Sequence, residues 1–134
     1  MSILAAPRFL RHVLVADAIS CLATGAAQVT AAQPLATLLG LPRALLAGTG
    51  WLLLAYAAVV ALVAMRDSPP PRPVRAFAAG NLAWALGCVA LLASGLVAPT
   101  ALGVAWVLAQ AAVVVLLAHL QWTALRHRRL AHHA

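Results

Sequence analysis

The sequence predicts an all-α, polytopic membrane protein whose four transmembrane helices form a bundle of two helical hairpins. Of the 134 residues, 65% are hydrophobic and only 8% are charged, which excludes a water-soluble domain. A hydrocarbon core about 30 Å thick needs about 20 apolar residues per crossing, so the chain has room for roughly four crossings. Prolines and arginines divide the chain into four apolar runs of that length.

The limits of each span follow from the breaks between these runs. A short basic lead precedes the first span, which ends before Pro34, and residues 35–41 form a brief apolar link in the interface plane. Pro42 suits the first turn of a helix, so the second span begins near Arg43. Pro99 lies in the tight turn between the last two spans. The expected spans are residues 12–31, 43–65, 76–96 and 101–125, within one membrane domain of residues 1–134.

Two segments outside these spans are expected to be non-helical. Residues 66–75 read RDSPPPRPVR and include four prolines within five positions. Proline has no amide hydrogen and its ring clashes with the preceding turn, so this segment is predicted to be a linker between the two hairpins. Residues 126–134 are predicted to be a basic, frayed tail.

The charge distribution predicts how the chain is oriented. There are nine arginines and no lysine, and eight of the nine lie on one side of the expected spans, with only Arg43 opposite. The positive-inside rule then places both termini and the linker in the cytoplasm. The arginine-rich, lysine-free composition suggests a bacterial inner membrane. We expect the arginines to contact anionic lipid at the cytoplasmic face, and we expect no nucleic acid partner.

The first span carries a continuous polar stripe. At 100° per residue its members fall within about 60° of one line on the helix. A carboxylate is costly at bilayer depth, so the acid of the stripe is expected to face protein or trapped water. The stripe consists of Asp17, Ser20, Cys21, Thr24 and Gln28.

Three polar residues from different spans are expected at one depth. Asp17 and Asn81 lie about 9 Å beyond the flanking arginines, and His119 lies about 10 Å from Arg126. If they converge, the layer is a candidate binding site that handles protons or a ligand. The alternative is an interhelical hydrogen-bond clasp worth about 1 kcal/mol or less.

The third span carries a seam of small residues that lets another helix approach closely. This seam fits packing within the bundle or across a homo-oligomer. Its members alternate spacings of three and four along one face: Gly80, Ala83, Gly87, Ala90 and Ser94.

Catalytic and metal-binding patterns are missing from the sequence. It has no nucleophile elbow, phosphate loop or zinc-ligand spacing, and its two acids do not form a carboxylate pair within the spans. Cys21 and Cys88 are expected to be small packing residues. A haem held by His12 and His119 is disfavoured, because His12 points about 140° away from Asp17. We therefore expect no enzyme activity, no cofactor and no metal.

Two resemblances bear on function. GLPRALLAGTGWLLLAYAA, NLAWALG and PTALG followed by LAQA are similar to uncharacterised four-helix bacterial inner-membrane proteins. Asp17 and Gly25 in the first span resemble the small multidrug resistance transporters. In that family an acid of the first helix alternately binds protons and cationic drugs.

The leading functional hypothesis is a small, non-enzymatic integral membrane protein that associates with itself or with a larger membrane complex. The alternative is a proton-coupled transporter of small solutes that uses Asp17, supported by Asn81 and His119. A third hypothesis, a membrane oxidoreductase or haem carrier, requires His119 or the cysteines to be reactive.

Overall fold

A computed structural model describes residues 7–133 of the chain, and the described part is helical with no strand. Four of its helices are long and apolar enough to cross a membrane, which confirms the predicted all-α class and the number of spans. The fifth, α2, is a short helix between the first two spans. The helices are α1 (Pro7–Thr30), α2 (Ala32–Leu39), α3 (Arg43–Ala64), α4 (Pro71–Ser94) and α5 (Ala101–His133).

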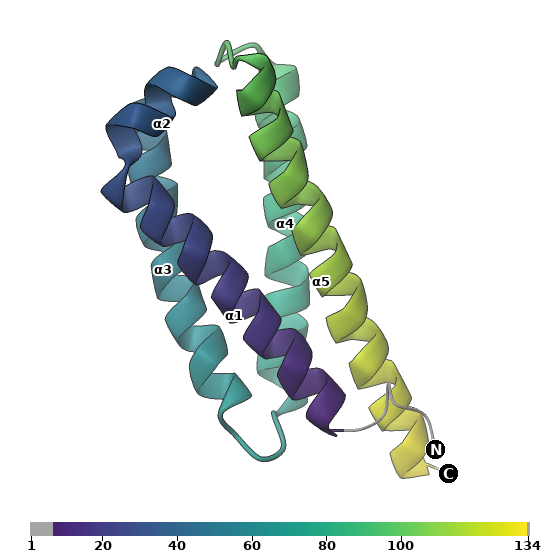
Figure 1. Cartoon of the computed structure of the whole chain (residues 1–134). Coiled ribbons are helices and arrows are strands. Elements are labelled where there is room, and N and C mark those ends of the chain that lie inside the picture. Colours follow the sequence, from purple (N-terminus) through teal and green to yellow (C-terminus); the bar gives the residue numbers. More distant parts are fainter. Residues whose placement is uncertain (1–6, 134) are drawn as a thin grey trace.

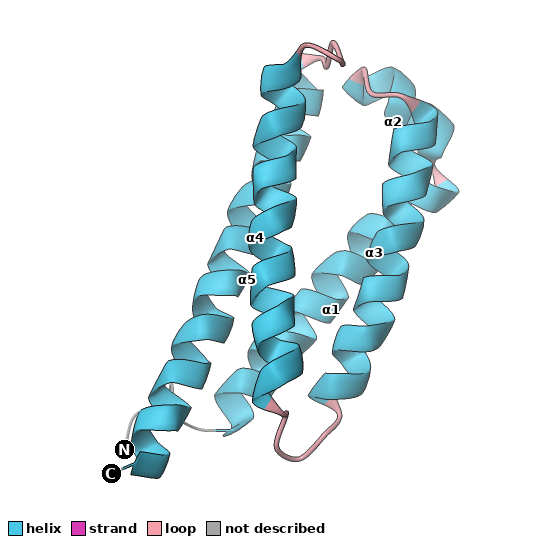
Figure 2. Cartoon of the chain, turned by 180° about the vertical axis from the view of Figure 1, so that it is seen from behind, coloured by secondary structure: helices cyan, strands magenta, loops and turns pink. Residues whose placement is uncertain are grey.

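The spans pair as two hairpins. Helix α1 packs along α3, and α4 packs along α5 (Figure 1). Between the hairpins α1 approaches α5, whereas the backbones of α3 and α4 lie farther apart, as the view from behind shows (Figure 2). Both described ends of the chain and the α3–α4 connection lie at the same end of the bundle, which we call the arginine-rich end (Figure 1).

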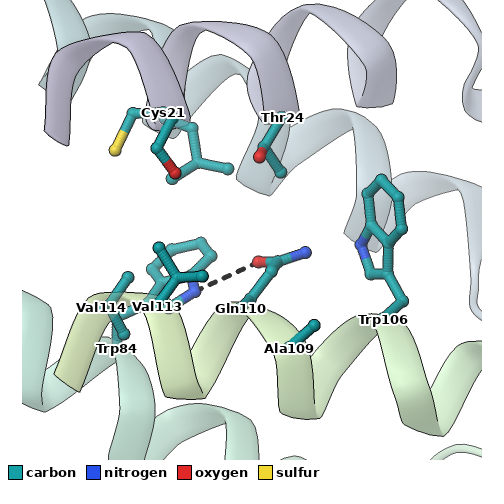
Figure 3. A pocket seen from close by; sticks show the side chains of 10 residues that line it. Cys21, Thr24, Trp84, Trp106, Ala109, Gln110, Val113 and Val114 are labelled. Atoms are coloured by element: carbon teal, nitrogen blue, oxygen red, sulfur yellow. Dashed lines mark hydrogen bonds between the residues drawn. The ribbon is translucent and has the colours of Figure 1, made fainter. Parts of the chain in front are cut away.

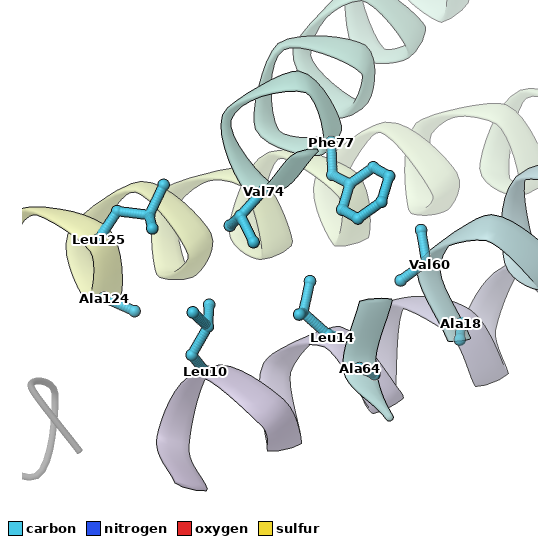
Figure 4. Close-up of a cluster of buried hydrophobic side chains, with 9 residues drawn as sticks. All are labelled: Leu10, Leu14, Ala18, Val60, Ala64, Val74, Phe77, Ala124 and Leu125. Atoms are coloured by element: carbon cyan, nitrogen blue, oxygen red, sulfur yellow. The ribbon is translucent and has the colours of Figure 1, made fainter. Parts of the chain in front are cut away.

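The hairpins are joined at the arginine-rich end by the main hydrophobic core (Figure 4). All four spans contribute buried aliphatic side chains to it, and the Phe77 ring meets Tyr56 edge-on with centroids 5.6 Å apart. The Tyr56 hydroxyl also donates to the carbonyl oxygen of Phe77 at 3.2 Å, which is a direct link between α3 and α4. The core consists of Leu10, Leu14, Ala18, Val60, Ala64, Val74, Phe77, Ala124 and Leu125.

At the opposite end, α2 closes the bundle against the start of α5. Gly40 ends α2 with a φ of +67°, a left-handed conformation that favours glycine. Thr100 then donates its amide to the carbonyl oxygen of Leu39 at 3.0 Å and its hydroxyl to that of Leu38 at 2.9 Å. Gly103 of α5 lies so close to the end of α2 that an added Cβ would stand 2.0 Å from the Leu39 carbonyl oxygen.

The first hairpin is packed most closely where two glycines face each other. A Cβ added to Gly25 of α1 would stand 2.8 Å from the carbonyl oxygen of Gly50 in α3. The backbones of α1 and α3 are therefore in direct contact at this level, as small residues permit in membrane helices.

The prediction of a non-helical linker over residues 66–75 is wrong for its second half, because α4 begins at Pro71 and includes Pro73. The amide groups of the first helical turn have no acceptor within the helix, so proline removes no hydrogen bond there. Helix α1 begins at Pro7, five residues before the expected start of the first span, and most of the 35–41 link belongs to α2. Residues 1–6 of the basic lead lie outside the described residues.

The prediction of a frayed tail over residues 126–134 is also wrong, because α5 continues to His133. The guanidinium of Arg128 donates to the Pro69 carbonyl oxygen at 2.6 Å and to the Ser68 hydroxyl. These bonds attach the last turns of α5 to the α3–α4 connection. Ala134 lies outside the described residues.

Candidate functional site

Asp17 is fully buried and accepts hydrogen bonds from three neighbours. Its Oδ2 accepts from Gln121 Nε2 at 2.6 Å and from Asn81 Nδ2 at 3.1 Å, and its Oδ1 accepts from Cys21 Sγ at 3.6 Å. Asp17 and Gln121 have no exposed surface, and Asn81 is 3% exposed. We call these four residues the Asp17 cluster.

The Asp17 cluster closes on itself. Asn81 Nδ2 also donates to Gln121 Oε1 at 3.2 Å, so the carboxyl and the two amides form a triangle. Each neighbour of Asp17 acts as a donor, which suits a carboxylate because that group only accepts. Since Asp17 lies on α1, Asn81 on α4 and Gln121 on α5, the triangle connects the two hairpins.

The predicted layer of Asp17, Asn81 and His119 is wrong at one position. The structure brings Asp17 and Asn81 together, but His119 is exposed on another face of α5 and is not part of the cluster. Gln121, two residues further along α5, takes the third place instead. His119 was predicted from its depth in the membrane alone. Residues two positions apart on a helix point about 200° apart, so His119 points away from the cluster when Gln121 points into it.

A second polar network lies farther from the arginine-rich end, and we call it the Gln28 cluster. Gln28 Nε2 donates to the Leu46 carbonyl oxygen and to Thr49 Oγ1, both at 2.9 Å. Gln110 Nε2 donates to Gln28 Oε1 at 3.4 Å, and Trp84 Nε1 donates to Gln110 Oε1 at 3.3 Å. The four side chains, from Gln28, Thr49, Trp84 and Gln110, come from all four spans.

One spacing explains why α1 and α5 take part in both clusters. Asp17 and Gln28 are eleven residues apart, and so are Gln110 and Gln121. Eleven residues advance a helix by about 1,100°, about 20° more than three full turns, so both members of each pair share a face. This spacing is the sequence signal that identifies Gln110 and Gln121, which depth in the membrane alone does not reveal.

A cavity of about 220 Å³ lies between the two clusters (Figure 3). Ser20, Cys21 and Thr24 of the polar stripe line it from α1, and Trp106 and Gln110 line it from α5. The polar stripe therefore turns into the protein: Asp17, Cys21 and Gln28 are buried, and Ser20 and Thr24 are half-buried.

The small-residue seam of α4 lies outside the packed interior. All five of its members, Gly80, Ala83, Gly87, Ala90 and Ser94, are exposed. A Cβ added to Gly87 would meet no other atom within 4 Å, and one added to Gly80 would meet only the Tyr56 ring at 3.9 Å. Gly80, Ala83 and Gly87 line one wall of a groove of about 430 Å³ between α4 and α3.

At the arginine-rich end, three guanidinium groups line one cavity. Arg75 of α4 and Arg126 and Arg129 of α5 border a space of about 270 Å³ together with Trp122 and Leu125. The chain has only two acidic side chains and a net charge of +7, so most of this positive charge must be balanced from outside the chain.

No group of three or more metal-ligating side chains is found among the described residues. Both cysteines are free: Cys21 is buried in the Asp17 cluster and Cys88 is half-buried. His12, like His119, is exposed. Compared with known proteins, the chain matches no family model, no curated protein and no solved structure.

Proposed function

We propose that this small integral membrane protein acts by association, and that its α4 seam packs against the same seam of a second copy. The observation that supports this proposal is the exposure of all five small residues of the seam, while α4 packs on α5 through its opposite side. Helices associate in lipid through close backbone packing at small residues, because apolar side chains gain little by leaving lipid for protein.

The topology predicts the symmetry of such a dimer. Two copies inserted in the same orientation are related by a two-fold axis along the membrane normal, which brings equal depths together. Gly87 of one copy then faces Gly87 of the other near the middle of the seam. The groove between α3 and α4 leaves room beside the seam for side chains of the partner.

Cysteine crosslinking in membranes tests this dimer. In a Cys88→Ala background, Gly87→Cys is expected to give a disulfide-linked dimer upon mild oxidation. Leu116→Cys, on the exposed face of α5, serves as the control and is expected to stay monomeric. Gly87→Leu should also reduce the dimer fraction in detergent by more than half. Equal crosslinking at positions 87 and 116, or a monomer at every concentration, would contradict the dimer.

We propose that the cavity lined by Arg75, Arg126 and Arg129 binds anionic lipid. We also propose that the arginine-rich end lies on the cytoplasmic side of a bacterial inner membrane. Basic pockets between membrane helices on that side favour phosphate head groups, and each arginine contributes about 1 kcal/mol. Trp122 beside the guanidiniums suits the level of the head groups.

Arg126→Gln is therefore expected to weaken binding of phosphatidylglycerol relative to phosphatidylcholine about fivefold, as measured by native mass spectrometry. Arg43→Gln removes the same charge at the opposite end and is expected to have no effect. Inorganic phosphate that competes as well as the lipid would identify a soluble anion as the ligand. Equal losses in the two variants would contradict a local site.

Proton-coupled transport through Asp17 is the second candidate. It is supported by the contact between Asp17 and Cys21, because Cys21 also lines the 220 Å³ cavity. Proton uptake at Oδ2 would require the carboxyl to give up a hydrogen bond from Asn81 or Gln121 in each cycle, because both amides donate to that oxygen. The closed hydrogen-bond triangle favours the clasp over this role.

A further inference from the structure

We infer that the cavity between the Asp17 and Gln28 clusters is a binding site for a small, uncharged, mainly apolar molecule that carries a carbonyl oxygen. This inference is independent of whether the protein dimerises, because none of the lining residues belongs to the α4 seam.

The first argument is an indole N–H without a partner. Nε1 of Trp106 is buried and makes no hydrogen bond, and it is the only such side-chain nitrogen or oxygen found in the described part of the chain. The other cavity tryptophan, Trp84, donates its N–H to Gln110. Figure 3 shows the Trp106 nitrogen on the side of the ring that faces Gln110 and Thr24. A buried donor left unpaired is unfavourable, so a ligand acceptor that reaches this N–H after a small side-chain movement would relieve that penalty.

The second argument is the character of the walls. Leu53, Val113 and Val114 and the two tryptophan rings are apolar, while the hydroxyls of Ser20 and Thr24 supply polar groups on the α1 side. Asp17 itself does not line the cavity, and its oxygens are occupied by the donors described above. The walls thus offer donors to an acceptor but no free charged group to pair with an ion, which favours an uncharged ligand.

The third argument concerns size and access. A cavity of about 150 Å³ holds benzene, so 220 Å³ accommodates a benzene ring with a substituent of a few atoms. Ala109 and Val113, at the edge of the cavity on α5, are exposed, and Val113 is exposed to 43%. The cavity therefore opens sideways between α1 and α5, where an apolar molecule dissolved in the bilayer would enter.

A matched pair of probes tests the carbonyl directly. The full-length protein in phosphatidylcholine nanodiscs is titrated with para-fluoroacetophenone or with para-fluoroethylbenzene, which lacks the carbonyl oxygen, and binding is followed by fluorine NMR. Empty nanodiscs give the baseline for partitioning into lipid. We expect saturable binding of the ketone. Its affinity should be about fivefold above that of para-fluoroethylbenzene (the hydrocarbon probe), since one neutral hydrogen bond distinguishes the two probes.

Variants then locate the site. Trp106→Phe keeps a ring but removes the N–H, and it is expected to lower ketone affinity to that of the hydrocarbon while leaving hydrocarbon binding unchanged. Trp51→Phe is the control, because Trp51 is 63% exposed on α3 and does not line the cavity. Ala109→Phe fills the cavity and should abolish binding of both probes. If Ala109→Phe does not fold, Val113→Phe is used in its place, because Val113 also lines the cavity.

Three results would each overturn the inference: no saturable binding of the ketone, equal affinities for the two probes, or unchanged ketone affinity in Trp106→Phe.

Discussion

Gly103→Ala is expected to lower the free energy of unfolding by about 3 kcal/mol or more. The added Cβ would stand 2.0 Å from the Leu39 carbonyl oxygen and 2.9 Å from the Pro99 side chain. The obstructing atom is backbone, and Thr100 holds it in place through a hydrogen bond. To relieve the clash, α2 must move away from α5 and that end of the bundle must open. Unfolding in mixed micelles, followed by circular dichroism, measures the loss.

Gly48→Ala provides the matched control, because an added Cβ there meets nothing within 4 Å. It is expected to leave stability unchanged or raise it by up to about 1 kcal/mol, the difference in helix propensity between the two residues. If both variants unfold at the same denaturant concentration, the close contact between α2 and α5 is not present in the folded protein.

Asp17→Leu is expected to lower the free energy of unfolding by about 2–3 kcal/mol. Leucine removes the carboxyl oxygens that accept from Gln121, Asn81 and Cys21, and it leaves amide donors facing an apolar side chain. Asp17→Asn keeps one acceptor oxygen and should cost about 1 kcal/mol. The same unfolding titration measures both losses. Asp67→Asn makes the same substitution in the exposed connection and is expected to be neutral.

The Asp17→Asn variant also separates the clasp from transport. A clasp predicts reduced stability and no change in flux across proteoliposomes under a pH gradient. Transport predicts that the variant abolishes a pH-dependent flux while its unfolding curve stays the same as that of the unmodified protein. The second pattern would replace association with transport as the function.

The spans were predictable because hydropathy and length dominate in lipid, and long apolar runs allow few alternatives. The helix ends were less predictable. Proline breaks a helix in its interior, but Pro71 and Pro73 occupy the first turn of α4, where no amide hydrogen is needed. The end of α5 depends on a tertiary contact from Arg128 to residues 68 and 69, which no local pattern reveals.

The candidate site was predictable in depth but only partly in direction. Counting residues from the arginines correctly placed Asp17 and Asn81 at one level, and they are hydrogen-bonded. The same count predicted His119, because depth does not show which face of α5 points into the bundle. That face carries Gln121, whereas His119 is exposed. The cavity was not predictable, since it arises from the space that remains between hairpins. The unpaired N–H of Trp106 likewise becomes evident only once its neighbours are placed.

The division into hairpins has a mechanical consequence. Within the first hairpin the backbones touch at Gly25 and Gly50, so we expect α1 and α3 to tilt together. The cavity has Ser20, Thr24 and Leu53 from that unit on one wall, and Trp84, Trp106 and Gln110 from the other unit facing them. A change in the angle between the units therefore alters the width of the cavity. A molecule held there would in turn bias that angle, so occupancy and shape are thermodynamically linked.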